Sequence, residues 1–209
     1  MPYPVMAEVK AILDLYHPRI RSVVEQAWAE FRSIAKLRTE NGFAPILYSR
    51  TVANDVFDAI ARYAIVEFSS DPAVHIVIES QTIKLYFKGG VFARFKKGDD
   101  NKLGQNHATQ ASLAFEDADA QMVLFPEDTK KVEFIWTAND ISTQLENVLV
   151  VARDGDKLLW DYEIPSAAGA GSGTIIPFPE PPVPPTADDG DALVKAKKPD
   201  IKTPKENEE

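Results

Sequence analysis

Basic and aromatic side chains between Lys84 and Lys102 give this sequence its clearest capacity for chemistry. The stretch has six basic and two acidic residues, although the whole chain of 209 residues has a formal net charge of −9. Cations can hold phosphate groups, and aromatic rings can stack on nucleic-acid bases. We therefore expect a local binding surface on an acidic protein that has no general attraction to nucleic acid.

Alternating hydrophobicity predicts that three strands, near residues 74–79, 82–87 and 91–96, carry this surface. A two-residue turn at Gly89-Gly90 would place Arg94 opposite Leu85 and bury its charge. A three-residue turn, Lys88-Gly89-Gly90, keeps one face apolar and provides glycine where the turn needs a positive φ. The expected core-facing pairs are Ile78–Ile83, Ile76–Leu85, Val74–Phe87, Phe87–Val91, Leu85–Ala93 and Ile83–Phe95.

The opposite face of these strands holds the candidate functional residues. It is expected to carry His75, Glu79, Lys84, Tyr86, Phe92, Arg94 and Lys96. With the polar loop that follows, the predicted binding residues are Lys84, Tyr86, Phe92, Arg94, Lys96, Lys97, Lys102, Asn106 and Gln110. Two other interpretations stay open. The face could be an ordinary solvated one whose lysines prevent edge pairing, or helices could cover it and make Tyr86 and Phe92 part of the core.

Part of the same face also suits a ribonuclease that needs no metal. Such enzymes place Lys, Arg, His or Glu around the scissile phosphate for proton transfer and charge stabilisation. The residues that could act here are His75, Glu79, Lys84 and Arg94. Helices followed by an antiparallel sheet with such a face form a layout similar to that of the RelE-type ribonuclease toxins. No motif of that family is present, this chain is longer, and those toxins are usually basic.

Motifs for metals, cofactors and nucleophiles are incomplete or missing. The chain has no cysteine, and its three histidines are far apart in the sequence. The run from Lys96 to Gln110 lacks the residue order of a P-loop. Glu79-Ser80-Gln81 lacks the lysine that a nuclease of the PD-(D/E)xK kind would need. We expect no metal and no cofactor, and a non-enzymatic protein is favoured.

Helices are expected before the strands, at about residues 5–16, 18–39 and 51–69. The second has an apolar stripe that continues to Ile34 and Leu37, near its end. Further strands are expected at 108–115, 132–136, 147–153 and 158–164, with a short helix or turn at 138–146. Helices and strands in separate parts of the chain favour an α+β fold. Three helices would pack on a mostly antiparallel sheet of about six strands.

A single domain is predicted at residues 1–164, with helices at 5–69 and the sheet at 73–164. Residues 165–209 are rich in Gly and Pro and then charged, so we expect a disordered tail. Its P-x-x-P sequences could make a secondary contact with a partner. The N-terminus lacks the pattern of a secretory signal, and no segment is apolar enough to span a membrane. We therefore expect a cytoplasmic bacterial protein.

The strings FARFKKGDDNKLGQN, ATQ and ENVLVVARDGDKLLWDYEI resemble a group of uncharacterised bacterial proteins from mobile elements or defence loci. The resemblance spans about Tyr3 to Ile164 and implies no activity. Together, the basic patch and the incomplete catalytic motifs predict a non-enzymatic binding or regulatory module. It would belong to a bacterial accessory system of the toxin–antitoxin or phage-defence type and recognise a protein, RNA or DNA.

Overall fold

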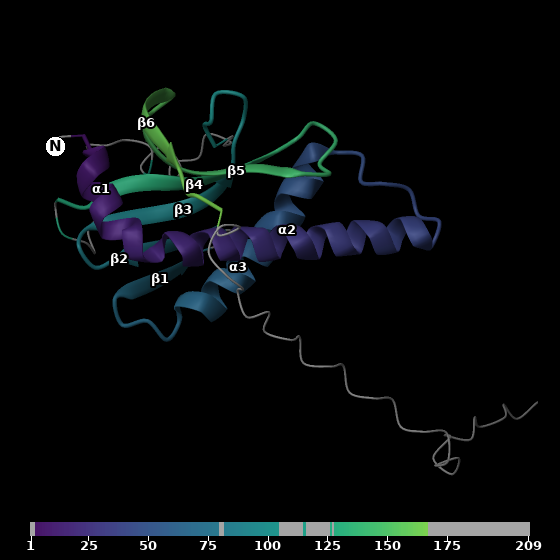
Figure 1. The fold of residues 1–209 in the computed structure, drawn as a ribbon, viewed down its shortest axis with the longest axis horizontal. Coiled ribbons are helices and arrows are strands. Elements are labelled where there is room, and N and C mark those ends of the chain that lie inside the picture. The colour runs from purple at the N-terminus through teal and green to yellow at the C-terminus, as the bar shows by residue number, and fades with distance from the viewer. Residues whose placement is uncertain (1–2, 80–81, 105–114, 116–125, 127, 167–209) are drawn as a thin grey trace, which may run out of the picture. The chain divides into compact units, whose positions relative to one another are not determined.

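The computed structural model describes residues 3–79, 82–104, 115, 126 and 128–166 (Figure 1). In this part of the chain, helices pack on a six-stranded, mostly antiparallel sheet, which confirms the predicted α+β class. Several predicted features lie outside the described residues. They are Asn106, Gln110, the strand at 108–115 except for Phe115, and the tail at 167–209.

The helical elements are α1 (Met6–Leu13), α2 (His17–Glu40) and α3 (Ser49–Phe68). A 3-10 turn, η1 (Asp14–Tyr16), joins α1 to α2 with no loop between them. The first two predicted helices therefore form one helical run, so the described residues have two helical regions and not three. Pro18 does not break this run because it lies in the first turn of α2, where a backbone N–H has no helical acceptor.

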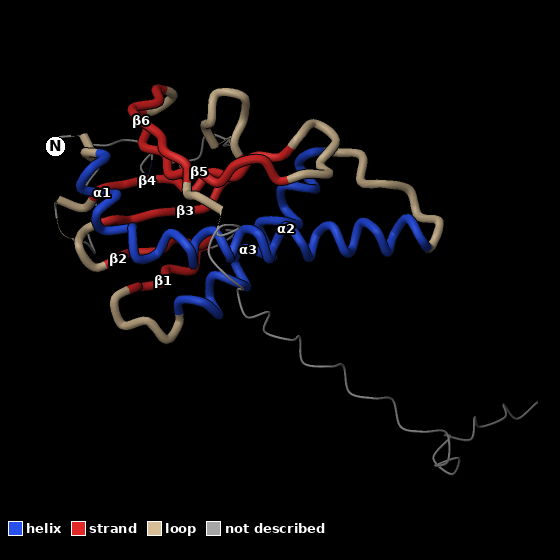
Figure 2. The backbone as a smooth tube through the Cα atoms, viewed as in Figure 1, coloured by secondary structure: helices blue, strands red, loops and turns tan. Residues whose placement is uncertain are grey.

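The sheet follows the order of the chain (Figure 2). Its strands are β1 (Val74–Glu79), β2 (Thr82–Phe87), β3 (Val91–Lys97), β4 (Lys130–Ala138), β5 (Leu145–Asp154) and β6 (Lys157–Glu163). Neighbours are antiparallel except β3 and β4, which are parallel. Parallel neighbours need a long crossover, and here residues 98–129 provide it. The predicted strands at 132–136, 147–153 and 158–164 are confirmed to within a few residues at their ends.

The register of β1, β2 and β3 confirms the three-residue turn. Val74 pairs with Phe87 across β1 and β2, and Phe87 pairs with Val91 across β2 and β3. Gly89 and Gly90 have φ angles of 115° and 92°, which residues with a side chain rarely adopt. The turn therefore fixes which residues of β3 face the helices.

The main core lies between the helices and one face of the sheet. Phe87 is central to it, because its ring contacts the rings of Tyr16, Phe68 and Phe134 at centroid distances of 4.8, 6.0 and 6.1 Å. Trp28 and Trp136 also pack together in this layer. Burying each such aromatic side chain contributes about 1.5–3 kcal/mol, so this layer is the main source of stability.

The connection between β4 and β5 is a turn and not a short helix. The side-chain Oδ1 of Asn139 accepts hydrogen bonds from the backbone N–H groups of Thr143 and Gln144, at 2.7 and 3.1 Å. An asparagine side chain that binds its own loop in this way favours a turn over helix continuation. Among the described helices, none combines the length and apolar character that crossing a membrane requires.

A buried histidine links the helices to the last strand. Nε2 of His17 lies 3.0 Å from the Tyr162 hydroxyl, and Nδ1 lies 3.3 Å from a carboxylate oxygen of Asp14. Burial lowers the pKa of His17 below its ordinary value, and the nearby Asp14 carboxylate opposes this only in part. Burial also raises the pKa of the Tyr162 hydroxyl. The imidazole is therefore held in its neutral form at the start of α2.

The turn at Gly89 provides a first prediction. A Cβ at this position would lie 3.2 Å from Ile12 of α1, at a φ that alanine avoids. Gly89→Ala should therefore lower the free energy of unfolding by about 1–3 kcal/mol, measured by urea denaturation. Gly42→Ala is the matched control, because Gly42 also has a positive φ but no atom within 4 Å of the added Cβ. Equal losses in the two variants would contradict the close packing of α1 on this turn.

A second prediction concerns His17. The unfolded chain binds a proton at this residue at a higher pH than the folded chain does, because burial lowers the folded pKa. Stability should therefore fall as the pH decreases below about 6.5, the ordinary histidine pKa. His17→Gln should lose less stability than the unmodified chain between about pH 7.5 and 5.5. Identical pH dependence of the two denaturation midpoints would show that His17 is not held neutral.

Candidate functional site

The predicted binding face is partly buried, which corrects the expectation for two of its residues. Arg94 and Phe92 have exposed fractions of only 4% and 1%, whereas Lys84, Tyr86 and Lys96 are half-buried. Helices do not cover this face, since they pack on the other one. The cover includes Phe115, whose ring lies 5.8 Å from that of Phe92 and 4.2 Å from the Arg94 guanidinium carbon.

Cations of this face are bound to carboxylates of the same chain. Nζ of Lys84 lies 2.7 Å from an oxygen of Glu79, and Nζ of Lys102 lies 2.7 Å from an oxygen of Asp161. Lys97 takes no part in the face, because its Nζ lies over the Trp136 ring of the helix-covered core, 5.9 Å from the centroid. A phosphate group would have to compete with these carboxylates, which weakens the prediction of a nucleic-acid surface.

The four residues of the ribonuclease hypothesis are not gathered into one centre. Lys84 and Glu79 do meet, and Lys84 pairs with Arg94 across β2 and β3. His75 is exposed and pairs with Tyr86 instead, on the outer side of the sheet. The Arg94 side chain binds Glu133 on the next strand. The set therefore lacks a free guanidinium for the phosphate.

Glu133 is the centre of a buried ionic cluster that sequence reasoning missed. Its Oε1 accepts hydrogen bonds from Nε and Nη2 of Arg94, at 2.9 and 2.6 Å. Its Oε2 lies 3.6 Å from Nη1 of Arg153 on β5. Arg153 also donates to the backbone carbonyls of Gly104 and Gly155. The side chains of this cluster therefore connect β3, β4 and β5, which are also paired through their backbones.

A sequence signal for this cluster exists but is weak. Glu133 is the one charge in the predicted strand 132–136, and Arg153 is the one charge in the predicted strand 147–153. Alternation places each on the face opposite the main core. What the sequence does not reveal is the parallel pairing of β3 with β4, which sets Arg94 directly beside Glu133. Without that neighbour, the alternation of the strand predicts that Arg94 lies in solvent.

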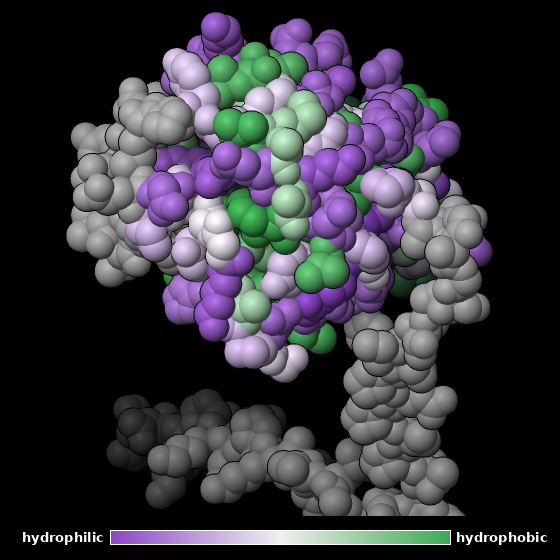
Figure 3. Space-filling view, turned by 60° about the vertical axis from the view of Figure 1, so that its left-hand side comes forward, coloured by the Kyte–Doolittle hydropathy of each residue, from purple (hydrophilic) through white to green (hydrophobic). Residues whose placement is uncertain are grey.

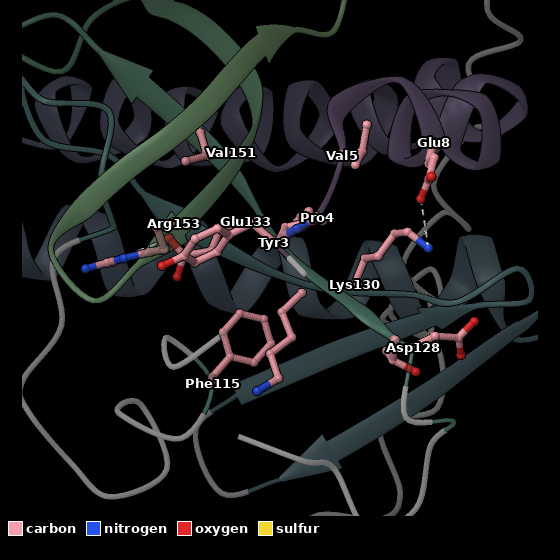
Figure 4. Close-up of a pocket in the computed structure, with 13 residues that line it drawn as sticks. Tyr3, Pro4, Val5, Glu8, Phe115, Asp128, Lys130, Glu133, Val151 and Arg153 are labelled. Atoms are coloured by element: carbon pink, nitrogen blue, oxygen red, sulfur yellow. Dashed lines mark ion pairs between the residues drawn. The ribbon is translucent and has the colours of Figure 1, made fainter. Parts of the chain in front are cut away.

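Beside this cluster lies a pocket of about 460 Å³ (Figure 4). Its lining comes from the N-terminal segment, α1, the crossover between β3 and β4, the start of β4 and the end of β5. The lining residues are Tyr3, Pro4, Val5, Glu8, Phe115, Asp128, Thr129, Lys130, Lys131, Val132, Glu133, Val151 and Arg153. The volume is in the range of ordinary ligand sites. Figure 4 shows Glu133 and Arg153 together at one end, and the Glu8–Lys130 ion pair at the other.

A second candidate surface lies at the far end of α2, which extends past the strands (Figure 1). Buried residues of α2 end at Phe31, so residues 32–40 form about 14 Å of helix without a buried side. We call the exposed apolar residues here the helix-tip surface, and they are Ile34, Leu37, Phe43, Leu47 and Tyr48. Their exposed fractions run from 49% for Ile34 to 82% for Leu47.

The helix-tip surface has a defined local structure. The backbone N–H of Phe43 donates to the Arg38 carbonyl at 2.9 Å, which holds the loop against the end of α2. Arg38 in turn donates to the Ala44 carbonyl. The apolar stripe of α2 continues to Ile34 and Leu37, but both side chains are exposed because the sheet ends before them.

Comparison with known proteins gives no functional assignment, since no family model, curated protein or solved structure matches the chain. Within the described residues, no group of three or more His, Cys, Asp or Glu side chains is placed to hold a metal ion. The site chemistry must therefore be judged from the residues themselves.

The ionic cluster provides a third prediction. Arg94→Met should lower the free energy of unfolding by about 3–5 kcal/mol, because it leaves the Glu133 carboxylate buried without its main partner. Lys102→Met is the control, and it should cost less than about 1 kcal/mol because the Lys102–Asp161 pair is much more exposed. If Arg94→Met lowers the free energy of unfolding no more than Lys102→Met does, the Arg94–Glu133 pair is not buried and this account of the cluster is wrong.

Proposed function

We propose that this protein is a non-enzymatic binding module that recognises another protein through the helix-tip surface. The observation that carries the proposal is the exposure of five large apolar side chains at the unsupported end of α2 and its following loop. Large apolar side chains left exposed along one short segment of chain are typical of protein interaction sites. A helix end without tertiary packing is also marginal in water by itself, so a partner would stabilise it.

The charge around this surface indicates the chemistry of the partner. Residues 32–50 contain four basic residues and one acidic residue, in a chain whose net charge is −9. Arg32 and Arg38 donate to backbone carbonyls, which leaves their charge in place. The partner should therefore present apolar side chains within an acidic surface. Two copies of this chain would bring two basic tips together, which does not favour self-association through them.

Catalysis is supported less well. The ribonuclease alternative needs Lys84 and Arg94 available to a phosphate, and both are bound to carboxylates. A nucleic acid could use the basic residues of the tip, but the aliphatic side chains of Ile34, Leu37 and Leu47 suit a protein better. Membership of a toxin–antitoxin or phage-defence system stays a prediction from the sequence, as does a secondary contact by the proline-rich tail.

A fourth prediction tests the partner surface. The full chain should retain one specific protein from cells of its source, identified by mass spectrometry and then purified. Leu37→Asp and Phe43→Asp should each weaken binding to that protein at least about tenfold in calorimetry, because an acidic group would oppose an acidic, apolar partner. Binding of the unmodified chain should also weaken as salt is raised.

Leu15→Asp is the matched control, since Leu15 is exposed to 84% but lies in η1, next to the opposite end of α2. It should bind the partner like the unmodified chain. The proposal is wrong if the full chain retains no protein. It is also wrong if Lys84→Ala abolishes binding while Leu37→Asp and Phe43→Asp do not, or if the chain binds only nucleic acid.

A further inference from the structure

We propose that two copies of this chain pair through β1, an edge strand of the sheet, in an antiparallel, two-fold symmetric contact centred on Val77. This edge is separate from the helix-tip surface, so either proposal can fail alone. Hydrophobic groups reach the surface in several places among hydrophilic ones (Figure 3), and a single exposed apolar residue does not identify a binding site. The pairing is indicated instead by backbone groups of β1, by the register that they permit and by the side chains which that register brings together.

β1 lacks the features that usually prevent an edge strand from pairing. Its only neighbour in the described sheet is β2, and their register runs without a bulge from Val74 to Glu79. Its six residues, VHIVIE, include one carboxylate and no lysine, arginine or proline. The other edge strand, β6, carries charges at Lys157, Asp161 and Glu163. An apolar edge without such protection is a ready template for another strand, so β1 is the edge expected to pair.

The backbone of β1 presents hydrogen-bonding groups on its open side. In an antiparallel pair, alternate residues direct both their N–H and their C=O towards the neighbouring strand. The Ala73 carbonyl accepts a hydrogen bond from the Lys88 N–H at 2.9 Å, so the odd-numbered residues are the ones that bond to β2. Ile76 and Ile78 therefore direct their N–H and C=O groups to the open side. Within the described residues, no backbone hydrogen bond from another segment reaches them.

These outward groups select one register for the pair. When Val77 lies opposite Val77 of the second copy, Ile76 lies opposite Ile78, and each of the two Ile76–Ile78 pairs exchanges both of its backbone hydrogen bonds. A register centred nearer the start of β1 would need the Val74 N–H, which already donates to the Asp71 carbonyl at 3.1 Å. A register centred nearer its end would reach past Glu79, where β1 stops.

The same register matches the side chains of the two copies. On the helix side of the sheet, Ile78, which is 68% exposed, would pack against the half-buried Ile76 of the second copy. On the outer side, His75 would lie opposite Glu79, so an imidazole N–H can donate to a carboxylate. Glu79 already binds Lys84, but a carboxylate has about four lone-pair sites and can accept further bonds. Each contact occurs twice because the pair has two-fold symmetry.

One flank of α3 adds apolar surface beside this edge. α3 contacts β1, and Arg62 and Glu67 form ion pairs with residues of α2. The flank turned away from α2 carries three half-buried apolar side chains at four-residue spacing, which are Phe57, Ala61 and Ile65. A second copy at the β1 edge would bury this flank further. Paired strands alone cover less than a standard interface, so we expect a reversible dimer with a dissociation constant on the order of micromolar.

A single introduced cysteine can report this pairing, because the chain has none of its own. Across the two-fold axis, the two Val77 residues form a pair without hydrogen bonds between them, with Cα atoms about 4.5 Å apart, which permits a disulfide. Val77→Cys should therefore form a covalent dimer under mild oxidation, seen in non-reducing electrophoresis. Leu15→Cys is the control, since Leu15 is exposed to 84% but lies outside β1. It should link at least about tenfold more slowly, because no contact holds its thiols together.

Sedimentation equilibrium of the full chain should show a monomer–dimer equilibrium at micromolar concentrations. Ile78→Lys should weaken the dimer at least about tenfold, because a lysine at an edge opposes strand pairing, and it should leave the monomer folded because Ile78 is exposed. Leu37→Asp, in the helix-tip surface, should leave the dimer unchanged. The proposal is overturned if the full chain stays monomeric at these concentrations, if Val77→Cys links no faster than Leu15→Cys, or if Ile78→Lys does not change the equilibrium.

Discussion

The carboxylate of Glu133 is the group on which the middle of this sheet depends. It is fully buried and lies between Arg94 of β3 and Arg153 of β5, so one side chain on β4 connects three strands. Removing charged side chains from water has a large cost in free energy. The attraction between the carboxylate and the guanidinium groups offsets this cost only when their hydrogen-bond geometry is good. A shift of β3 against β4 by one residue would turn Arg94 to the other face. The cluster therefore specifies the register of the parallel pair, which no hairpin turn fixes.

This structural use of charge changes the interpretation of the sheet face. The basic residues near Arg94 give the sequence the character of a phosphate-binding patch, but in the fold they are largely balanced by Glu79, Glu133 and Asp161. At the end of α2 the situation is reversed, because Arg32 and Arg38 donate to backbone carbonyls and large apolar side chains stay in solvent. The sheet face has cations that carboxylates of the same chain largely balance, whereas the helix-tip surface keeps its positive charge and its apolar side chains available to a partner. This difference favours the helix-tip surface as the binding site.

The sequence was sufficient for features that depend on neighbours in the chain. The Lys88-Gly89-Gly90 turn followed from matching apolar faces across a hairpin, and the register confirms it. It was insufficient where the neighbour is distant, since periodicity assigns a side chain to a face but does not say what covers that face. The pattern predicts that Arg94 lies in solvent, because nothing local shows that Glu133 is beside it. The pattern includes Leu37 in the apolar stripe of α2, because helical spacing continues past the end of the sheet. The pocket joins residues 3–8 to residues 128–153, which no local pattern connects.

The central claim is that the partner binds at the end of α2 and not on the sheet. Photo-crosslinking in the producing cells tests this directly, with a photoreactive amino acid placed at Phe43 in one variant and at Tyr86 in another. Phe43 lies in the helix-tip surface, and Tyr86 lies on the predicted sheet face. We expect one protein to be crosslinked from position 43 and not from position 86. Crosslinking of a protein or nucleic acid from position 86, with none from position 43, would contradict the account.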